Sequence, residues 1–285
     1  DLIRSRGLGD VYKRQNKIGH NSSEYINLLA EVMKYAYADR SKYLGDPDFY
    51  EVPIRKIISK EYANEISKNI EIGKLRPAKQ IHPGKFMRKE SHETTHFSVV
   101  DKQGNVVSMT YTLNSTFGSK VVIEGTGILM NNEMDDFSAA PGVPNQFNLL
   151  GAEANEIAPF KRPLSSMTPT IVLKNDELFF TTGSPGGARI ISAVLQSILN
   201  IIDFNMNLED TTLAKRIHHQ WYPDILEYEF TLDKNIEDDL KKIGYKTSSK
   251  LPLTSLQTIM FADGIYYGYG DFRRVDALAS GKIYD

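Results

Sequence analysis

The most constraining feature of this sequence is the stretch TTHFSVVDKQGNVVSMTYTLN, residues 94–114. Two runs of alternating residues flank a turn near Gln103 and Gly104, which is the pattern of an antiparallel hairpin. With the turn centred on or just after Gln103, paired positions sum to 206 or 207. Thr94 therefore faces Thr112 or its neighbour, and Asn114 lies just beyond. Two hydroxyls and an amide are predicted to converge at the open end of this hairpin.

This convergence has two interpretations. A Thr–Thr pair across two strands is common and stabilising without any chemistry. Alternatively, Thr94 is a nucleophile whose own α-amine serves as the base, because that amine has a pKa near 7.7–8.0 and is partly neutral at physiological pH. The second interpretation requires cleavage of the bond between Glu93 and Thr94. The preceding residues, 73–93, are basic and contain Pro77, Pro83 and Gly84, as expected of a solvated linker.

The remaining pattern predicts a layered α+β fold without strict βαβ alternation. An amphipathic helix is predicted over 21–44, with a capping box from Asn21 and Glu24. Further hairpins are predicted over 169–183 and 256–269, and a buried helix follows the glycine-rich turn GSPGGAR, 183–189. Another helix is predicted around 208–219.

Composition excludes several classes of protein. The net charge of −2 lacks the basic excess of a nucleic-acid-binding protein. The chain has no cysteine, which excludes thiol chemistry and disulfides. No apolar run approaches the roughly 20 residues of a membrane-spanning helix. His218 and His219 do not have the spacing of a zinc pair and are interpreted as structural, so no metal or cofactor is expected.

The first residues do not resemble native protein sequence. SRGLGDVYKRQ, residues 5–15, matches the in-frame translation of a transposon adaptor used in shotgun library preparation. The hypothesis is that residues 1–15 are a sequencing artefact and that the chain is an N-terminally truncated fragment. Native coding sequence across this stretch at the source locus would contradict it.

Three further clusters carry polar groups suited to an amino-acid substrate. Gly186 and Gly187 open a helix, where backbone N–H groups form an oxyanion hole or simply a tight turn. NNEMDDF, residues 131–137, concentrates carboxylates that suit a substrate ammonium or form an ordinary acidic loop. Ser165 and Ser166 suit a substrate carboxylate or satisfy nearby backbone groups.

These motifs together resemble the γ-glutamyltranspeptidase family of the N-terminal-nucleophile hydrolase superfamily. The resemblance is carried by the 94–114 stretch, GILMNNEMDDFS, KRPLSSMTPTIV, TTGSPGGARI and HHQW, and it runs from about residue 20 to the C-terminus. It implies a four-layer αββα sandwich and a precursor that cuts itself between Glu93 and Thr94. Residues 16–93 would then be the end of the large subunit, and 94–285 the small catalytic subunit, which pair as a heterodimer.

The resemblance also implies roles and a substrate. Thr94 matches the nucleophile and Thr112 the hydroxyl that orients it, while Gly186 and Gly187 match the oxyanion hole. The matches to substrate-binding residues are Asn114, Glu133 and Asp136 for the α-amino group, and Ser165 and Ser166 for the α-carboxylate. The implied activity transfers the γ-glutamyl group of glutathione or related amides to amino acids, peptides or water, in an exported enzyme, periplasmic or secreted.

Three departures from the family pattern matter. A carboxylate-binding arginine of the family lies upstream of this sequence. Phe147, in the loop 141–151 over the pocket, replaces a tyrosine of some bacterial members and removes a hydroxyl donor. Glu133 is glutamine in some members. The alternatives are a related acylase acting on β-lactam side chains or poly-γ-glutamate, and an inactive fragment.

Overall fold

The computed structural model describes residues 18–81, 94–138, 140, 143, 145, 149–252 and 254–282. The chain divides into two compact units, each assembled from three segments. Unit 1 consists of Asp1–Glu90, Glu133–Ser165 and Ile217–Lys250, and unit 2 of Ser91–Asn132, Ser166–Arg216 and Leu251–Asp285. The predicted boundary between residues 93 and 94 is a cleavage boundary, and it stays a prediction.

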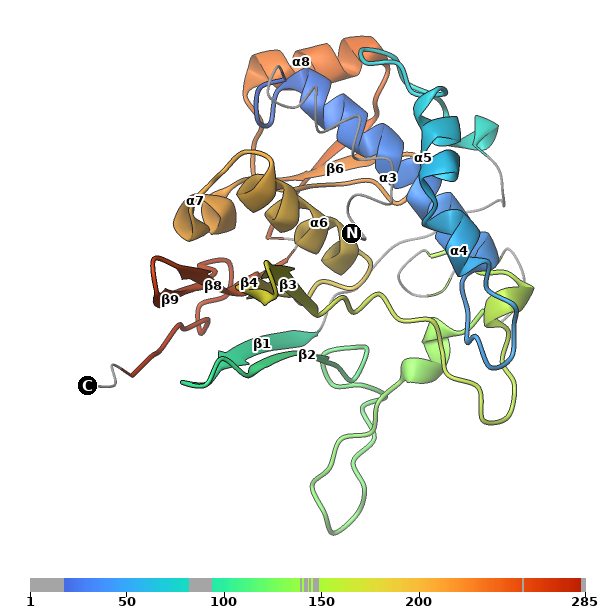
Figure 1. Cartoon of the computed structure of the whole chain (residues 1–285). Helices are drawn as coiled ribbons and strands as arrows, with labels where there is room; N and C mark the ends of the chain where they lie inside the picture. The colour runs from blue at the N-terminus through green and yellow to red at the C-terminus, as the bar shows by residue number, and fades with distance from the viewer. Residues whose placement is uncertain are drawn as a thin grey trace. The chain divides into compact units, whose positions relative to one another are not determined.

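Unit 2 is a layered α+β structure. Its main sheet has the strand order β3-β4-β8-β9, and each neighbouring pair is antiparallel. Helices α6 and α7 lie on one side of this sheet and the β1–β2 hairpin on the other (Figure 1). The elements are β1 (Thr95–Val100), β2 (Val106–Tyr111), β3 (Thr170–Lys174), β4 (Glu177–Thr182), α6 (Arg189–Ile202), α7 (Leu208–Leu213), β8 (Gln257–Ala262) and β9 (Ile265–Gly270). The α+β prediction is confirmed, and among its described residues unit 2 contains three of the four layers that the resemblance implies.

The two faces of the β1–β2 hairpin differ in burial because successive side chains of a strand point to opposite faces. His96 is buried on the face toward the four-stranded sheet, and the Ser98 hydroxyl on that face donates to the carbonyl of Gln257 at 3.1 Å. The opposite face exposes large apolar side chains: Phe97, Val99, Val107, Met109 and Tyr111. The hairpin therefore presents an apolar surface to solvent in this chain.

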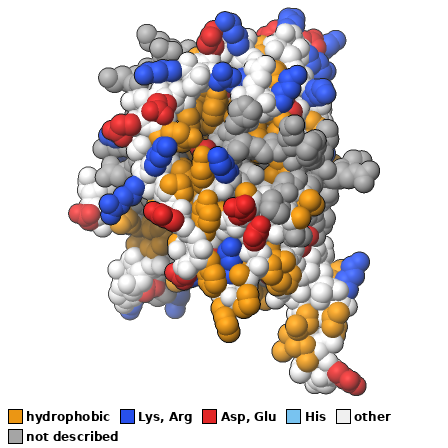
Figure 2. Space-filling view, turned by 90° about the vertical axis from the view of Figure 1, so that its right-hand side faces the viewer, with side chains coloured by type: hydrophobic (Ala, Val, Ile, Leu, Met, Phe, Trp, Pro, Cys, Tyr) orange, Lys and Arg blue, Asp and Glu red, His pale blue; other side chains and the backbone are white. Residues whose placement is uncertain are grey.

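Residues 117–130 form an arm that extends from the same unit, at the bottom of Figure 1. Its two sides are joined by a bridge between Val122 and Leu129 and by a backbone hydrogen bond from the Met130 N–H to the Val121 carbonyl. Figure 2 shows hydrophobic side chains on the projecting lobe. The exposed apolar residues of the arm are Phe117, Val121, Val122, Ile123, Ile128 and Met130.

Unit 1 is built around the long helix α3. The predicted helix is present, but Ser22 rather than Asn21 caps it: the Ser22 hydroxyl accepts the Tyr25 N–H at 3.2 Å, while Asn21 has a left-handed φ of 53°. The three-stranded sheet has the order β5-β6-β7, with β6 and β7 parallel and joined through α8. The elements are α3 (Ser23–Tyr43), α4 (Ile54–Ile57), α5 (Lys60–Ser67), η1 (Ala78–Gln80), η2 (Glu133–Asp136), η3 (Glu153–Asn155), β5 (Ile217–His218), β6 (Leu226–Glu229), α8 (Lys234–Ile243) and β7 (Thr247–Lys250).

The helix predicted around 208–219 is wrong over its second half. Helix α7 ends at Leu213, and residues 217–218 form strand β5, which pairs with β6. Arg216, which follows the end of the helix, pairs with a buried carboxylate, as described below. In the described part of the chain, no helix combines the length and apolarity needed to cross a bilayer.

Candidate active site

Thr94 and Thr112 face each other at the open end of the hairpin. The register pairs Thr95 with Tyr111 and places Thr94 opposite Thr112, so the predicted pairing is confirmed. The Thr94 hydroxyl donates to the Thr112 hydroxyl oxygen across 3.5 Å, and Thr94 is buried. The Thr94 hydroxyl is therefore directed at the Thr112 oxygen at the open end of the hairpin.

Asn114 continues the chain from Thr112 in a conformation that few residues adopt. Its φ is 75°, in the left-handed region that asparagine tolerates better than most residues. The Asn114 N–H donates to the Thr112 hydroxyl at 2.8 Å, and its side-chain amide donates to the carbonyl of Asn132 at 3.1 Å. Asn132 in turn accepts the Ser115 N–H at 3.0 Å. This network holds Asn114 beside Thr112 and fixes the residue that precedes Glu133.

His96 connects the hairpin to the glycine-rich turn. Its Nδ1 lies 2.8 Å from the Thr110 hydroxyl and its Nε2 lies 3.2 Å from the Ser98 hydroxyl. Burial lowers the pKa of His96 to about 4, so the ring is neutral at physiological pH. A Cβ on Gly183 would lie 2.2 Å from His96 Cε1, so only glycine permits this contact. Sequence analysis did not select His96, although it shares a strand face with Thr94.

The turn between β4 and α6 carries Gly186 and Gly187 with positive φ values of 135° and 56°. The carbonyls of these two glycines accept the N–H groups of Arg189 and Ile190, respectively, in the first turn of α6. The turn is buried, and the Ser184 hydroxyl accepts the Ser255 N–H at 3.0 Å. The N-terminus of a 14-residue helix favours a developing negative charge, so this turn is chemically suited to an oxyanion.

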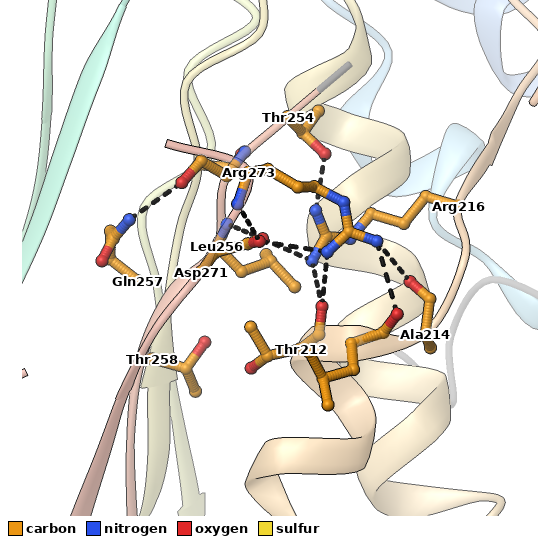
Figure 3. Close-up of polar contacts among 12 residues, drawn as sticks. Thr212, Ala214, Arg216, Thr254, Leu256, Gln257, Thr258, Asp271 and Arg273 are labelled. Atoms are coloured by element: carbon orange, nitrogen blue, oxygen red, sulfur yellow. Dashed lines mark hydrogen bonds and ion pairs between the residues drawn. The ribbon is translucent and has the colours of Figure 1, made fainter. Parts of the chain in front are cut away.

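A buried ionic cluster braces the segment that supports this turn (Figure 3). Asp271 accepts from Arg216 at 2.7 Å and from Arg273 at 3.0 Å, and it also accepts the Leu256 N–H at 2.9 Å. Burial alone would raise the pKa of Asp271, but the charges of Arg216 and Arg273 hold it below its ordinary value. Because Leu256 directly follows Ser255, the cluster anchors the backbone that contacts Ser184.

The acidic motif forms the short helix η2 in unit 1. Burial raises the pKa of Asp136 to about 7; the neighbouring Glu133 carboxylate adds to this, and the Arg40 guanidinium opposes it. Burial also raises the pKa of Glu133. Burial therefore favours the protonated form of both carboxyl groups. Sequence analysis did not select Arg40, which is itself buried.

The segment leading to Ser165 is held by two polar contacts within unit 1. The Asn155 side chain bridges the backbone of Asp136 and Leu164, with distances of 2.7 Å and 2.9 Å. Arg162 forms an ion pair with Asp46 in the turn after α3. Ser165 follows Leu164 at the end of unit 1, and Ser166 begins the next segment of unit 2, where its carbonyl accepts the Thr168 hydroxyl.

The structure thus brings Thr94, Thr112 and Asn114 together in unit 2, and Glu133 and Asp136 together in unit 1. Glu93 and Phe147 lie outside the described residues. The chemical roles predicted for all these residues stay predictions.

Comparison with known proteins identifies the family of this chain. The model of the gamma-glutamyltranspeptidase family matches residues 8–281. The glutathione hydrolase proenzyme of Escherichia coli K12 is 50% identical over 266 residues, which are 93% of this chain and 46% of that protein. The chain therefore spans about half the length of the curated relatives it matches.

Solved structures agree with this relationship. A gamma-glutamyltranspeptidase variant from Helicobacter pylori matches 63% of this chain and 100% of its own chain, with 49% identity and a TM-score of 0.61. A cephalosporin acylase from Bacillus halodurans matches 98% of this chain and 50% of its own, with 26% identity and a TM-score of 0.76. The chain belongs to the gamma-glutamyltranspeptidase family, within the N-terminal-nucleophile hydrolase superfamily.

Proposed function

We propose that the protein is a self-processing γ-glutamyl transferase and hydrolase. The pairing of Thr94 with Thr112 carries the proposal, because it places one hydroxyl to orient another at the start of a strand. A relative from E. coli K12 is a glutathione hydrolase proenzyme, which supports both the substrate class and the processing step.

The first reaction is self-cleavage. The Thr94 oxygen attacks the carbonyl carbon of Glu93, the Glu93–Thr94 C–N bond breaks, and the departing nitrogen takes a proton. The acyl group is then an ester on Thr94, and water hydrolyses it to release the Glu93 carboxylate. The Thr112 oxygen accepts the hydrogen bond of the Thr94 hydroxyl and thereby orients its lone pairs for this attack. The product carries a free α-amine on Thr94.

The second reaction uses the new amine as the base. It accepts the hydroxyl proton as the Thr94 oxygen attacks the γ-carbonyl of glutathione or a related amide, and the leaving amine takes a proton. Attack by water on the resulting γ-glutamyl ester gives hydrolysis, and attack by an amino acid or peptide gives transfer. The Gly186 and Gly187 amides are assigned to the oxyanion. The assigned donor-binding residues are Asn114, Glu133 and Asp136 for the ammonium, and Ser165 and Ser166 for the α-carboxylate.

The test is to express the protein from its complete reading frame. We expect mass spectrometry to find a new N-terminus at Thr94, and we expect release of nitroaniline from a γ-glutamyl nitroanilide. Thr94→Ala should remain intact and inactive, whereas Thr94→Ser should retain both reactions at a lower rate. Wild-type turnover by Thr94→Ala would remove the nucleophile from the proposal.

The main alternative is an acylase that acts on glutaryl or β-lactam side chains. The similarity to a cephalosporin acylase suggests this alternative. The acidic pair Glu133–Asp136 favours a donor that carries an ammonium group, because a glutaryl group would offer it no opposite charge. Comparing γ-glutamyl and glutaryl nitroanilides separates the two activities. Equal or faster cleavage of the glutaryl amide would favour the acylase.

The partner in the proposal is the large subunit of the same precursor. Support comes from the apolar outer face of β1–β2, where Phe97, Val99 and Met109 are exposed, whereas helices cover the outer face of each sheet in an αββα sandwich. Phe97→Ser with Met109→Ser should release the two subunits at lower denaturant concentration after cleavage. Leu251→Ser, at another exposed apolar position, is the control and should not change their association.

Two further parts of the proposal rest on the family resemblance alone. Phe147 is assigned to a loop over the pocket, and Phe147→Tyr should change the ratio of hydrolysis to transfer. An unchanged ratio would remove Phe147 from the proposal. The protein is also proposed to be exported, periplasmic or secreted, which cell fractionation with activity staining would test.

A further inference from the structure

Asn155 joins two segments to which the proposed function assigns opposite ends of the donor. Its side-chain amide nitrogen donates to the carbonyl of Asp136 at 2.7 Å, and its side-chain oxygen accepts the Leu164 N–H at 2.9 Å. Asp136 is assigned to the donor ammonium, and Ser165, the residue after Leu164, to the donor carboxylate. A single buried side chain thus links these two elements of unit 1.

The surroundings of Asn155 make this link rigid. The Asn155 backbone carbonyl accepts the Ser138 N–H at 2.8 Å, so Asn155 contacts the residues on both sides of Phe137. Asn155 is 5% exposed, and with Arg40, Asp136 and Leu164 it lines a small cavity. Both side-chain hydrogen bonds of Asn155 are partly buried, so their loss leaves two backbone groups poorly satisfied.

Only an asparagine side chain supplies both contacts at this reach. Aspartate keeps the acceptor for Leu164 but cannot donate to the Asp136 carbonyl when it is ionised. Leucine has a similar shape and makes neither hydrogen bond, and alanine leaves both backbone groups unpaired. Asn155 therefore joins the acidic helix η2 to the segment before Ser165 through one hydrogen bond on each side.

We propose that Asn155 is a positioning residue that sets the spacing between Asp136 and Ser165, and thereby selects donors with an α-amino-acid head. The inference rests on the proposed function for the identity of the donor. Asn155 does not touch the reacting atoms. It controls how well one donor engages both groups at once, and self-cleavage, which uses neither group, does not depend on it.

The experiment compares L-glutamate with glutarate, and γ-glutamyl with glutaryl nitroanilide, in the mature enzyme from the complete reading frame. In the wild type we expect calorimetry to show preferential binding of L-glutamate. In Asn155→Ala this preference should fall by about tenfold or more, the loss expected from one to two buried hydrogen bonds. The KM for the γ-glutamyl donor should rise, the glutaryl kinetics should not change, and Thr94 should still appear as a new N-terminus.

Asn27→Ala provides the matched control. Asn27 is also a buried asparagine of unit 1, and its side chain donates to Tyr245 and to the Lys74 carbonyl, away from η2. It should lower the melting temperature and leave the glutamate-to-glutarate ratio unchanged. If Asn155→Ala does not fold, Asn155→Asp, which retains the Leu164 contact, is measured instead and should lose the preference as well.

The outcomes separate the inference from the proposed function. Selective binding of L-glutamate without any γ-glutamyl cleavage would overturn the proposed function and leave the positioning role supported by the variant's lost selectivity. An unchanged ratio in the Asn155 variant, an equal loss for both ligands, or a wild type without preference for L-glutamate would overturn the positioning role.

Discussion

The hydroxyl of Thr94 donates across 3.5 Å to the hydroxyl of Thr112, which also accepts the Asn114 N–H at 2.8 Å. The Thr112 oxygen therefore joins the proposed nucleophile to a residue held in a left-handed conformation two positions along the chain. A substitution that removes this oxygen removes the acceptor of both the Thr94 hydroxyl and the Asn114 N–H. Substituting Thr112 therefore tests how the Thr94 hydroxyl is oriented without altering Thr94 itself.

Thr112→Val should slow self-cleavage by about ten- to a hundredfold, because valine keeps the branched shape but leaves the Asn114 N–H unsatisfied and the Thr94 hydroxyl unoriented. Thr112→Ser, which keeps the hydroxyl, should retain most of the self-cleavage rate. The measurement is the time course of the new N-terminus at Thr94 by mass spectrometry. Equal rates for the valine variant and the wild type would show that the pair is a structural cross-strand contact only.

The hairpin could be predicted from sequence because its signal is local. Alternation along residues 95–111 and one turn determine the register, and the register alone places Thr94 opposite Thr112. The end of α7 could not be predicted in this way. Arg216 is drawn into a buried cluster with Asp271, 55 positions away, and the next residues then extend as β5. Contacts with residues distant in the sequence thus accompany the departure from the local helical pattern.

The candidate site shows the same division. Residues inside long motifs, such as Thr94 and Asp136, were selected from sequence, whereas Asn155 and Arg40 were not. The contacts of Asn155 connect the short helix η3 to groups 9 and 19 positions away, and no periodic sequence pattern predicts such contacts. His96 could have been found, because the two-residue period of a strand places it on the same face as Thr94.

Gly183→Ala should impair the glycine-rich turn through His96. The added methyl group would lie 2.2 Å from the His96 ring, which hydrogen bonds hold against Thr110 and Ser98. Displacing the turn by even an ångström misplaces the amides assigned to the oxyanion, so kcat should fall by about a hundredfold. Gly19→Ala is the control, since its nearest contact would be an ordinary 3.9 Å. Wild-type kcat in the Gly183 variant would show that the turn tolerates the shift.

Donor binding should weaken as the pH falls through neutrality. The pKa of Asp136 is raised to about 7 by burial and by Glu133, against the opposing charge of Arg40, so its carboxyl is protonated below that pH and charged above it. Only the charged form attracts an ammonium, so the donor KM should fall by about tenfold between pH 6 and pH 8. The measurement is steady-state kinetics across this pH range, with KM and kcat fitted separately.

Glu133→Gln tests the cause of this pH dependence. It removes the like charge beside Asp136 and should shift the midpoint of the KM profile to lower pH. Asp135 also raises the pKa of Asp136, but less than Glu133 does, so Asp135→Asn should shift the midpoint less. A midpoint that stays in place in Glu133→Gln would assign the shift to burial alone.

Asp271→Asn should destabilise unit 2 more than the loss of an exposed ion pair would, because it removes the carboxylate with which the buried Arg216 and Arg273 both form ion pairs. We expect a loss of about 3–5 kcal/mol in the free energy of unfolding. Because the pKa of Asp271 is lowered in the folded state, its contribution is present above the unfolded value near 3.8 and is lost as the pH falls through the folded pKa. The wild type and Asp271→Asn should therefore converge in stability at acidic pH.

Asp239→Asn, which removes the exposed pair with Lys242, is the control and should leave the denaturation midpoint unchanged. Equal midpoints for all three proteins at neutral pH would show that the cluster does not brace the segment behind Ser184.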